Sequence, residues 1–201
     1  MRQSHEVPAS IAQGFGLIQL LLVALILAGL LLWSVESVIH LYHRAASEGY
    51  MQELMHTVKS GRIHAIQYRT PVTLCHLSAQ KVCDRNWHLG MQLFSDQNGN
   101  KQQDEGEDIL YQLMPVSSAS AHLVYNRRYI HFSVTGSTLG SNGHFIYCPI
   151  YGPERNRQHD QLARIIVINR QGRARLAGDD DRDGIADHNG KNAVCADEQH
   201  G

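Results

Sequence analysis

The 201-residue sequence lacks an excess of charge of either sign. Lys and Arg together number 18 and Asp and Glu number 19, which gives a formal net charge of −1 at pH 7. The net charge of the whole chain is too small to attract nucleic acid. Binding of nucleic acid would therefore need a local cluster of positive charge. Charge is also unevenly distributed, because residues 7–35 contain no charged side chain.

Motifs of common enzymes and zinc sites are missing as well. The sequence contains no GxSxG, Walker A, HExxH or CxxC motif, and its 13 histidines are scattered. These absences exclude the usual signatures of serine hydrolases, P-loop NTPases and zinc proteins. We therefore expect a protein that is not an enzyme, and the sequence indicates no cofactor other than the Ca²⁺ considered below.

Cysteine is scarce but even in number. The four cysteines are Cys75, Cys83, Cys148 and Cys195. In an exported domain an even count without CxxC favours two disulfides over metal or redox chemistry. Three pairings exist, and closeness along the chain favours Cys75 with Cys83 and Cys148 with Cys195.

Residues 15–35 form the one long hydrophobic run, FGLIQLLLVALILAGLLLWSV, with 21 uncharged residues. A helix of this length spans about 30 Å, the thickness of a bilayer core. A cleaved signal peptide would be shorter and would end in small residues. Here Glu36 and a continuing helical pattern follow. We expect residues 15–35 to form a transmembrane helix.

The helical pattern continues beyond the hydrophobic run. Apolar residues recur near the helical period as far as Val58, and no proline interrupts them before Pro71. Because a residue before proline disfavours the helical conformation, Thr70 closes the segment. The pattern predicts one helix from about residue 15 to about residue 68. Its residues 36–70 would pack on a domain, and Gly49 and Gly61 are points where it can bend.

After Pro71 the pattern changes to short strands separated by turn residues. The predicted strands are 72–77, 87–94, 108–114, 122–125, 129–134, 144–148, 162–169 and 173–177. The absence of βαβ alternation argues against a parallel sheet. The fold class is therefore α+β, with one long helix packed on antiparallel sheets and residues 71–201 as a β-rich domain.

A basic cluster precedes the C-terminus. In Gly172-Arg173-Ala174-Arg175 the two arginines project to one face of a strand, about 7 Å apart, which suits successive phosphates. Residues 152–175 contain six arginines against Glu154 and Asp160, a local charge of +4. The alternative is a glycine turn followed by a solvated strand. The residues predicted to bind double-stranded DNA are Arg164, Arg170, Gly172, Arg173 and Arg175.

An acidic run follows the basic cluster. Residues 179–187 fit the pattern DxDxDGxxD of calcium-binding loops, in which the glycine, here Gly184, makes the sharp turn. Position 12 is Gly190 where such loops carry a bidentate Glu. The alternative is a solvated acidic tail. The predicted Ca²⁺ ligands are Asp179, Asp181, Asp183, the backbone carbonyl of Ile185, and Asp187.

A second loop has similar spacing, with Asp96, Asn98, Asn100, Asp104 and Glu107 at the ligand positions. Here Lys101 replaces the turn glycine. We interpret this loop as a structural turn stabilised by Asx hydrogen bonds, with metal binding as the alternative.

Residues 14–21, GFGLIQLL, resemble the prepilin motif G-F-[ST]-L-[IV]-E-L-L of type IV pilins and type II secretion pseudopilins. The resemblance implies that residues 1–14 are a leader, and that prepilin peptidase cuts between Gly14 and Phe15 and methylates Phe15. Gln19 occupies the position of a glutamate that is thought to neutralise a neighbouring subunit's N-terminal amine. A glutamine accepts a hydrogen bond but brings no charge. The difference implies an unusual or peripheral place in a filament.

Further stretches resemble the GspH/FimT branch of this family: VTLC at 72–75, WHLG at 87–90, the 96–107 turn, FIYC at 145–148 and RIIVINRQGR at 164–173. The resemblance implies a minor pilin or pseudopilin with one span in the bacterial inner membrane. Its C-terminal domain would be periplasmic or at a pilus tip, and its partners other pilins. FimT-like minor pilins of DNA uptake carry GRxR at this place, which implies DNA contacts for Arg173 and Arg175. The alternatives are a secretion pseudopilin with no DNA role and a membrane-anchored calcium-dependent binding module.

Overall fold

The computed structural model describes residues 16–116, 121–150 and 161–195, without the side chains of residues 30–37, 39 and 40. The chain divides into two compact units, Met1–Tyr42 and His43–Gly201, and helix α1 (Leu17–Tyr68) contributes residues to both. The other elements are β1 (Val72–Leu77), β2 (Cys83–Asp84), the 3₁₀ turn η1 (Trp87–Leu89), β3 (Met91–Ser95), β4 (Ile109–Leu113), β5 (Ala121–Tyr125), β6 (Ile130–Phe132), β7 (Gly143–Pro149), β8 (Arg164–Ile168), β9 (Ala174–Leu176), β10 (Asp187–His188) and β11 (Lys191–Asn192).

Helix α1 contains 52 residues and ends where the sequence predicts. Arg69 adopts a left-handed conformation with φ of 52°, and Pro71 follows two residues later. Near its start Leu17, Leu20 and Leu25 are exposed. Within the described ranges, no helix is both long and apolar enough to cross a membrane. The remainder of the predicted 15–35 span includes residues that the structure does not describe.

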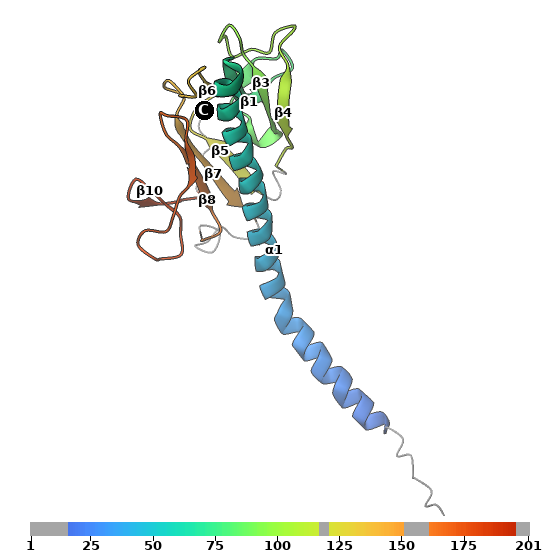
Figure 1. Cartoon of the computed structure of the whole chain (residues 1–201). Helices are drawn as coiled ribbons and strands as arrows, with labels where there is room; N and C mark the ends of the chain where they lie inside the picture. Colours follow the sequence, from blue (N-terminus) through green and yellow to red (C-terminus); the bar gives the residue numbers. More distant parts are fainter. Residues whose placement is uncertain (1–15, 117–120, 151–160, 196–201) are drawn as a thin grey trace, which may run out of the picture. The chain divides into compact units, whose positions relative to one another are not determined.

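The second half of α1 packs on the β-rich domain through an apolar stripe. Met51, Leu54, Val58 and Ala65 are buried in the main core, and Figure 1 shows this part of the helix lying along the strands. Gly61 has a role that differs from the predicted bend. A Cβ atom at Gly61 would lie 2.7 Å from Leu93 Cδ1 and 3.2 Å from a Phe132 ring carbon. The glycine therefore lets the helix approach the sheet closely.

In the described residues the domain contains two larger antiparallel sheets, besides the two-stranded β10–β11 sheet. The first has the order β2-β1-β3-β4, with β6 also paired with β1, and the second has the order β5-β7-β8-β9. Trp87 joins them, because its ring meets those of Tyr125 and Phe145 at 5.2 and 5.1 Å and its Nε1–H donates to the Arg127 carbonyl at 2.9 Å. The α+β fold class and the antiparallel arrangement are confirmed.

A second, smaller core lies on the other face of the second sheet. Ile165 on β8 packs there with Ile185, Ala186 and Ala193 from the C-terminal segment. That segment forms the β10–β11 hairpin, whose position near β8 is visible in Figure 1. The smaller core holds the acidic loop against the sheet.

Both disulfides follow the pairing that closeness along the chain favours. Cys75 bonds Cys83 with a Cα–Cα distance of 5.5 Å, and Cys148 bonds Cys195 with a distance of 5.6 Å. The first links β1 to β2, and the second links β7 to the segment after β11. The pairing prediction is confirmed.

The strand predictions agree with the structure except at one segment. Residues 87–94 were expected to form a strand, but Trp87–Leu89 forms a 3₁₀ turn and the strand begins at Met91. The reason is Gly90, which has φ of 92° and whose Cβ position would lie 2.8 Å from the Leu113 carbonyl oxygen. The two-residue strands β2, β10 and β11 were not predicted.

Candidate functional site

The basic motif forms the turn of the β8–β9 hairpin. The Gly172 N–H donates to the Asn169 carbonyl at 2.9 Å, and Gly172 has φ of 72°. The Asn169 N–H donates to the Arg173 carbonyl at 3.1 Å, and the Arg173 N–H donates to Asn169 Oδ1 at 2.9 Å. A left-handed residue at this position is typical of a three-residue hairpin loop, which favours glycine.

Neighbouring segments hold this turn in place. On α1, Arg62 Nε donates to the Gln171 carbonyl at 3.0 Å. In the loop before β7, the Thr138 N–H donates to the Arg170 carbonyl at 3.0 Å. A Cβ atom at Gly172 would lie only 2.2 Å from the Gly136 carbonyl oxygen. The turn is thus packed against two other parts of the domain.

Arg173 and Arg175 are exposed and lie on one face of the hairpin. Arg175 is paired with Val167 across the ladder, and Arg173 lies two residues earlier, so side-chain alternation places both on the Val167 side. In residues 16–116, 121–150 and 161–195, neither guanidinium forms an ion pair. Arg170, in the turn itself, is also exposed. Four of the predicted DNA-binding residues, from Arg170 to Arg175, are therefore close together.

Arg164 lies apart from them. It shares a face of β8 with Ile166 and Ile168, opposite to Val167, and its Nη2 lies 3.4 Å from Glu48 Oε1 on α1. Its Nη1 donates to the Ala163 carbonyl at 2.9 Å. The hydrogen bond from Arg44 lowers the pKa of Glu48, burial opposes this, and Arg164 lowers it further. The structure therefore assigns Arg164 to an intramolecular ion pair and does not bring it to the hairpin cluster. Arg155 and Arg157 lie outside the described residues.

The acidic loop brings together three of its predicted ligands. Carboxylate oxygens of Asp179, Asp181 and Asp187 lie within 4.8 Å of one another. Asp187 is buried and the other two are exposed. Gly184 has φ of 90°, and its N–H donates to Asp179 Oδ2 at 2.9 Å. The sharp turn expected at this glycine is confirmed.

Asp183 has other partners. Asp183 Oδ2 accepts a hydrogen bond from Asn192 Nδ2 at 2.6 Å, and its Oδ1 accepts one from the Ile185 N–H at 2.9 Å. The Ile185 side chain is buried in the smaller core, and the role of its backbone carbonyl as a Ca²⁺ ligand stays a prediction. The structure thus does not bring Asp183 to the three-carboxylate cluster. Asn192 was missed, because it lies outside the loop motif and reaches Asp183 only through the β10–β11 hairpin.

Crowding of the carboxylates affects Asp181. The hydrogen bond from the Asp183 N–H lowers the pKa of Asp181, but desolvation and the charges of Asp183, Asp187 and Asp179 outweigh it, so the pKa is raised. Like charges at such separations disfavour the ionised form. A bound cation would relieve this repulsion.

The 96–107 loop is stabilised by its own hydrogen bonds. Asn98 Oδ1 accepts from the Asn100 N–H at 3.0 Å, and Asn100 Oδ1 accepts from the Gln102 N–H at 2.9 Å. Lys101 adopts φ of 63°, the conformation that calcium loops give to glycine. The Asx hydrogen bonds predicted for this turn are confirmed.

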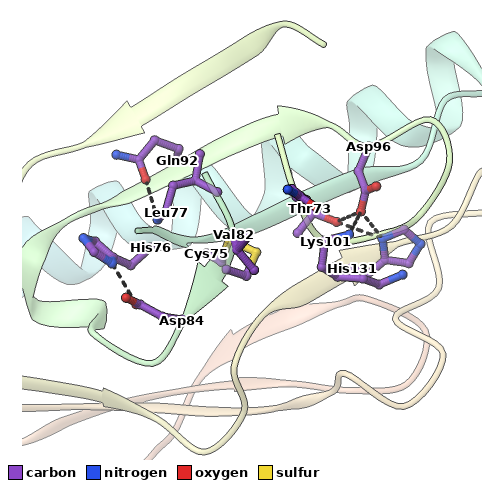
Figure 2. The surroundings of a disulfide bond; sticks show 12 residues. Thr73, Cys75, His76, Leu77, Val82, Asp84, Gln92, Asp96, Lys101 and His131 are labelled. Atoms are coloured by element: carbon purple, nitrogen blue, oxygen red, sulfur yellow. Dashed lines mark hydrogen bonds and ion pairs between the residues drawn. A yellow bond between two sulfur atoms is a disulfide. The ribbon is translucent and has the colours of Figure 1, made fainter. Parts of the chain in front are cut away.

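Asp96 begins that loop and is fully buried, and Figure 2 shows its carboxylate facing Thr73 and His131. Its Oδ2 accepts a hydrogen bond from Thr73 Oγ1 at 2.6 Å and lies 3.4 Å from His131 Nδ1. Burial raises the pKa of Asp96, but the hydrogen bonds from His131 and Thr73 and the charges of His131 and Lys101 outweigh it. The net pKa is lowered, which keeps this buried carboxylate ionised as the anchor of the loop.

Gly14 and Phe15, the predicted processing residues, lie outside the described residues. Gln19 lies in the first turn of α1, where it is exposed and its N–H donates to the Gly16 carbonyl at 2.9 Å. The described residues form no hydrogen bond with its side chain, and its part in assembly stays a prediction.

Comparison with known proteins gives one family match. Residues 51–172 match the family described as type II transport protein GspH. Two crystal forms of the type IV minor pilin FimU of Pseudomonas aeruginosa PAO1 are similar in structure. The P21 form has a TM-score of 0.49 and 13% identity over 67% of this chain and 90% of that chain. The P65 form has a TM-score of 0.46 and 14% identity over 65% and 92%. No curated protein matches the sequence.

Proposed function

Since the chain belongs to the GspH family of type II transport proteins, we propose that it is a non-enzymatic minor pilin or pseudopilin in a type IV pilus or type II secretion filament. The family membership agrees with the resemblance to GspH/FimT proteins. The match carries the proposal, because residues 51–172 include the packed half of α1 and most strands of both sheets. Its partners in this function are other pilins or pseudopilins.

The N-terminal segment supplies the anchor in this proposal. Residues 15–35 would hold the chain in the bacterial inner membrane after prepilin peptidase removes residues 1–14, and the peptidase would methylate Phe15. The uncharged stretch 7–35 and the exposed apolar side chains at the start of α1 support this. Two disulfides support a periplasmic or cell-surface domain, because disulfides persist in oxidising compartments.

Filament membership predicts where the protein is found. We expect the processed chain, residues 15–201, in the sheared-filament fraction of cells that have prepilin peptidase, and the unprocessed chain in the membrane fraction alone in cells that lack it. The reason is that an unprocessed subunit keeps its leader and cannot enter the filament. Immunoblots of both fractions measure this. Equal recovery from filaments of both strains would contradict the proposal.

Within this function, the β8–β9 hairpin is proposed to bind the phosphates of double-stranded DNA during uptake. The support is that Arg173 and Arg175 share one exposed face and that the turn before them is fixed by contacts with α1 and the loop before β7. The backbone of the turn is held, and the planar guanidinium of arginine is pre-organised, so less conformational entropy is lost for each hydrogen bond formed. The competing version is a secretion pseudopilin whose hairpin contacts no DNA.

The acidic loop is proposed to bind Ca²⁺ through Asp179, Asp181 and Asp187. The support is the 4.8 Å clustering of their carboxylate oxygens. Hard oxygen donors suit this ion, but only three carboxylates converge, so we expect an affinity of about 10⁻⁴ M, at the weak end of such loops. A calcium-dependent binding module unrelated to filaments would share this site, but it would lack prepilin processing.

Calcium should raise the melting temperature of the full chain in detergent. At 10 mM Ca²⁺ and the expected affinity, the stabilisation is about 2.7 kcal/mol, which corresponds to a shift of roughly 5–10 °C. The Asp179→Asn variant should lose the shift. Asp180→Asn is the matched control, because Asp180 is exposed and lies outside the cluster. No shift for the wild type in differential scanning calorimetry would exclude a functional site.

A further inference from the structure

A hollow of about 400 Å³ lies at one end of the second sheet. Its walls come from the loop after β5, the start of β7, the end of β8 with the following turn, and the β10–β11 hairpin. The sequence motifs did not indicate it, because its residues come from four separated segments. Its volume is within the range of small-molecule sites.

The lining is cationic and polar. Arg127 comes from the loop after β5 and Arg170 from the turn after β8, whereas His144 lies on β7 and His188 on β10. Four asparagines add amide donors and acceptors, and none of the eleven described lining residues is Asp or Glu. A concave surface with guanidinium groups and no carboxylate suits an anion that carries further polar groups.

The nearby acidic loop does not place a carboxylate in the hollow. Asp187 directly precedes His188 on β10, and side chains alternate along a strand. Asp187 Oδ2 accepts a hydrogen bond from the Asp180 N–H at 2.7 Å, so its carboxylate is directed at the acidic loop. His188, the next residue, is the one that lines the hollow.

The backbone around the hollow is fixed. The Arg127 carbonyl accepts a hydrogen bond from Trp87 Nε1, and the Arg170 carbonyl accepts one from the Thr138 N–H. Gly143 approaches Asn126 so closely that a Cβ atom would lie 1.9 Å from Asn126 Oδ1, which also accepts the His144 N–H at 3.1 Å. Within the described parts of the chain, the guanidinium groups of Arg127 and Arg170 have no ion-pair partner. The site is thus built on a held backbone with two available cations.

The histidine at the rim has an unused polar atom. The rings of His144 and His188 lie 4.6 Å apart, and His188 Nδ1 is buried with no hydrogen-bond partner among the described atoms. Buried polar atoms are nearly always paired in folded proteins. The other ring nitrogen of His188, Nε2, lies 3.1 Å from Asn189 Nδ2 on the same rim.

We propose that this hollow binds the phosphate group of a small phosphomonoester, such as a nucleotide or a sugar phosphate, separately from DNA binding by Arg173 and Arg175. Two guanidinium groups on different walls suit a phosphomonoester, which has about two negative charges and three terminal oxygens. They suit a ligand with a single carboxylate less well, because it has one charge and two oxygens. The asparagines contact the hydroxyl groups or the base that the phosphate carries. A nucleotide and a sugar phosphate share the phosphate group, and the experiment below distinguishes between these two ligands.

The test is calorimetric titration of the full chain, kept in a non-ionic detergent, with thymidine 5′-phosphate, ribose 5-phosphate and galacturonate. Both phosphates should bind about tenfold or more tightly than the carboxylate sugar. Equal affinity for both phosphates would assign recognition to the phosphate and sugar, and tighter binding of the thymidine phosphate would add the base. Undetectable binding of both phosphates at millimolar concentration would overturn the proposal, as would equal binding of galacturonate.

Matched variants localise the binding. Arg127→Gln should weaken phosphate binding about tenfold, because one of two charge-assisted contacts is lost. Arg128→Gln is the control, because Arg128 is the exposed neighbour that does not line the hollow. His188→Asn, checked for its melting temperature, provides a second variant inside the hollow and should also weaken binding. Equal losses in Arg127→Gln and Arg128→Gln would mean diffuse surface attraction and would overturn the assignment.

The double variant Arg173→Ala, Arg175→Ala tests whether the hollow is separate from the DNA-binding hairpin. It should keep its affinity for thymidine 5′-phosphate, and a weaker affinity in this variant would contradict a separate site.

Discussion

Replacing both Arg173 and Arg175 by alanine is expected to weaken binding of duplex DNA by about 30-fold or more. Each exposed guanidinium can form a charge-assisted hydrogen bond to a phosphate, and the hairpin holds both on one face. The slope of log affinity against log salt should also decrease by about 2, because two fewer counterions are released per complex. Fluorescence anisotropy at several salt concentrations, with the full chain in detergent, measures both quantities.

Arg164→Ala is the informative control for that experiment. Arg164 belongs to the same arginine-rich segment, but it pairs with Glu48 on the opposite face of β8. We expect the DNA affinity of this variant to stay within about twofold of the wild type, since no phosphate contact is removed. An unchanged salt slope in the double variant would remove the DNA-binding version and favour the secretion pseudopilin.

Gly172→Ala is expected to destabilise the domain by about 2–4 kcal/mol. One part of this cost is the left-handed conformation, since Gly172 has φ of 72°. The larger part is the contact that a Cβ atom would make at 2.2 Å from the Gly136 carbonyl oxygen, because a backbone atom cannot rotate away. The melting temperature should fall by roughly 5–15 °C in a thermal scan.

Gly190→Ala separates the two parts of this cost. Gly190 has φ of 70°, but nothing lies within 4 Å of its Cβ position. This variant should lose only about 1 kcal/mol, the cost of the left-handed conformation. If Gly172→Ala melts at the temperature of Gly190→Ala, the close approach of the hairpin to the loop before β7 is not present in solution.

The order of helix and strands and the disulfide pairing could be predicted, because they depend on signals that lie close together in the sequence. Pro71 limits α1, and alternation identifies most strands within one or two residues. The pairing of Cys75 with Cys83 follows from their closeness in sequence, and it leaves Cys148 for Cys195. Trp87 was misassigned because the approach of Gly90 to the Leu113 carbonyl is a tertiary contact that periodicity does not reveal.

The site residues were harder to predict, because their faces depend on strand register. A shift of one residue in the β8–β9 pairing would have placed Arg175 beside Ile166 or Ile168, on the same face as Arg164. Likewise, spacing alone treats Asp183 as equivalent to Asp179 and Asp181. Its partner Asn192 arrives through a two-residue strand pair whose sequence signal is too short to recognise. The phosphate-binding hollow had no local signal at all.

The most direct test of the filament-subunit proposal is N-terminal sequencing of the mature protein from cells with active prepilin peptidase. The proposal predicts that the chain begins at Phe15, with a mass that also includes one added methyl group on the amine. Gln19 would then lie at the fifth mature position, the place of the family's glutamate. An intact residue 1–14 leader in those cells would contradict a pilin or pseudopilin function and leave the membrane-anchored binding module.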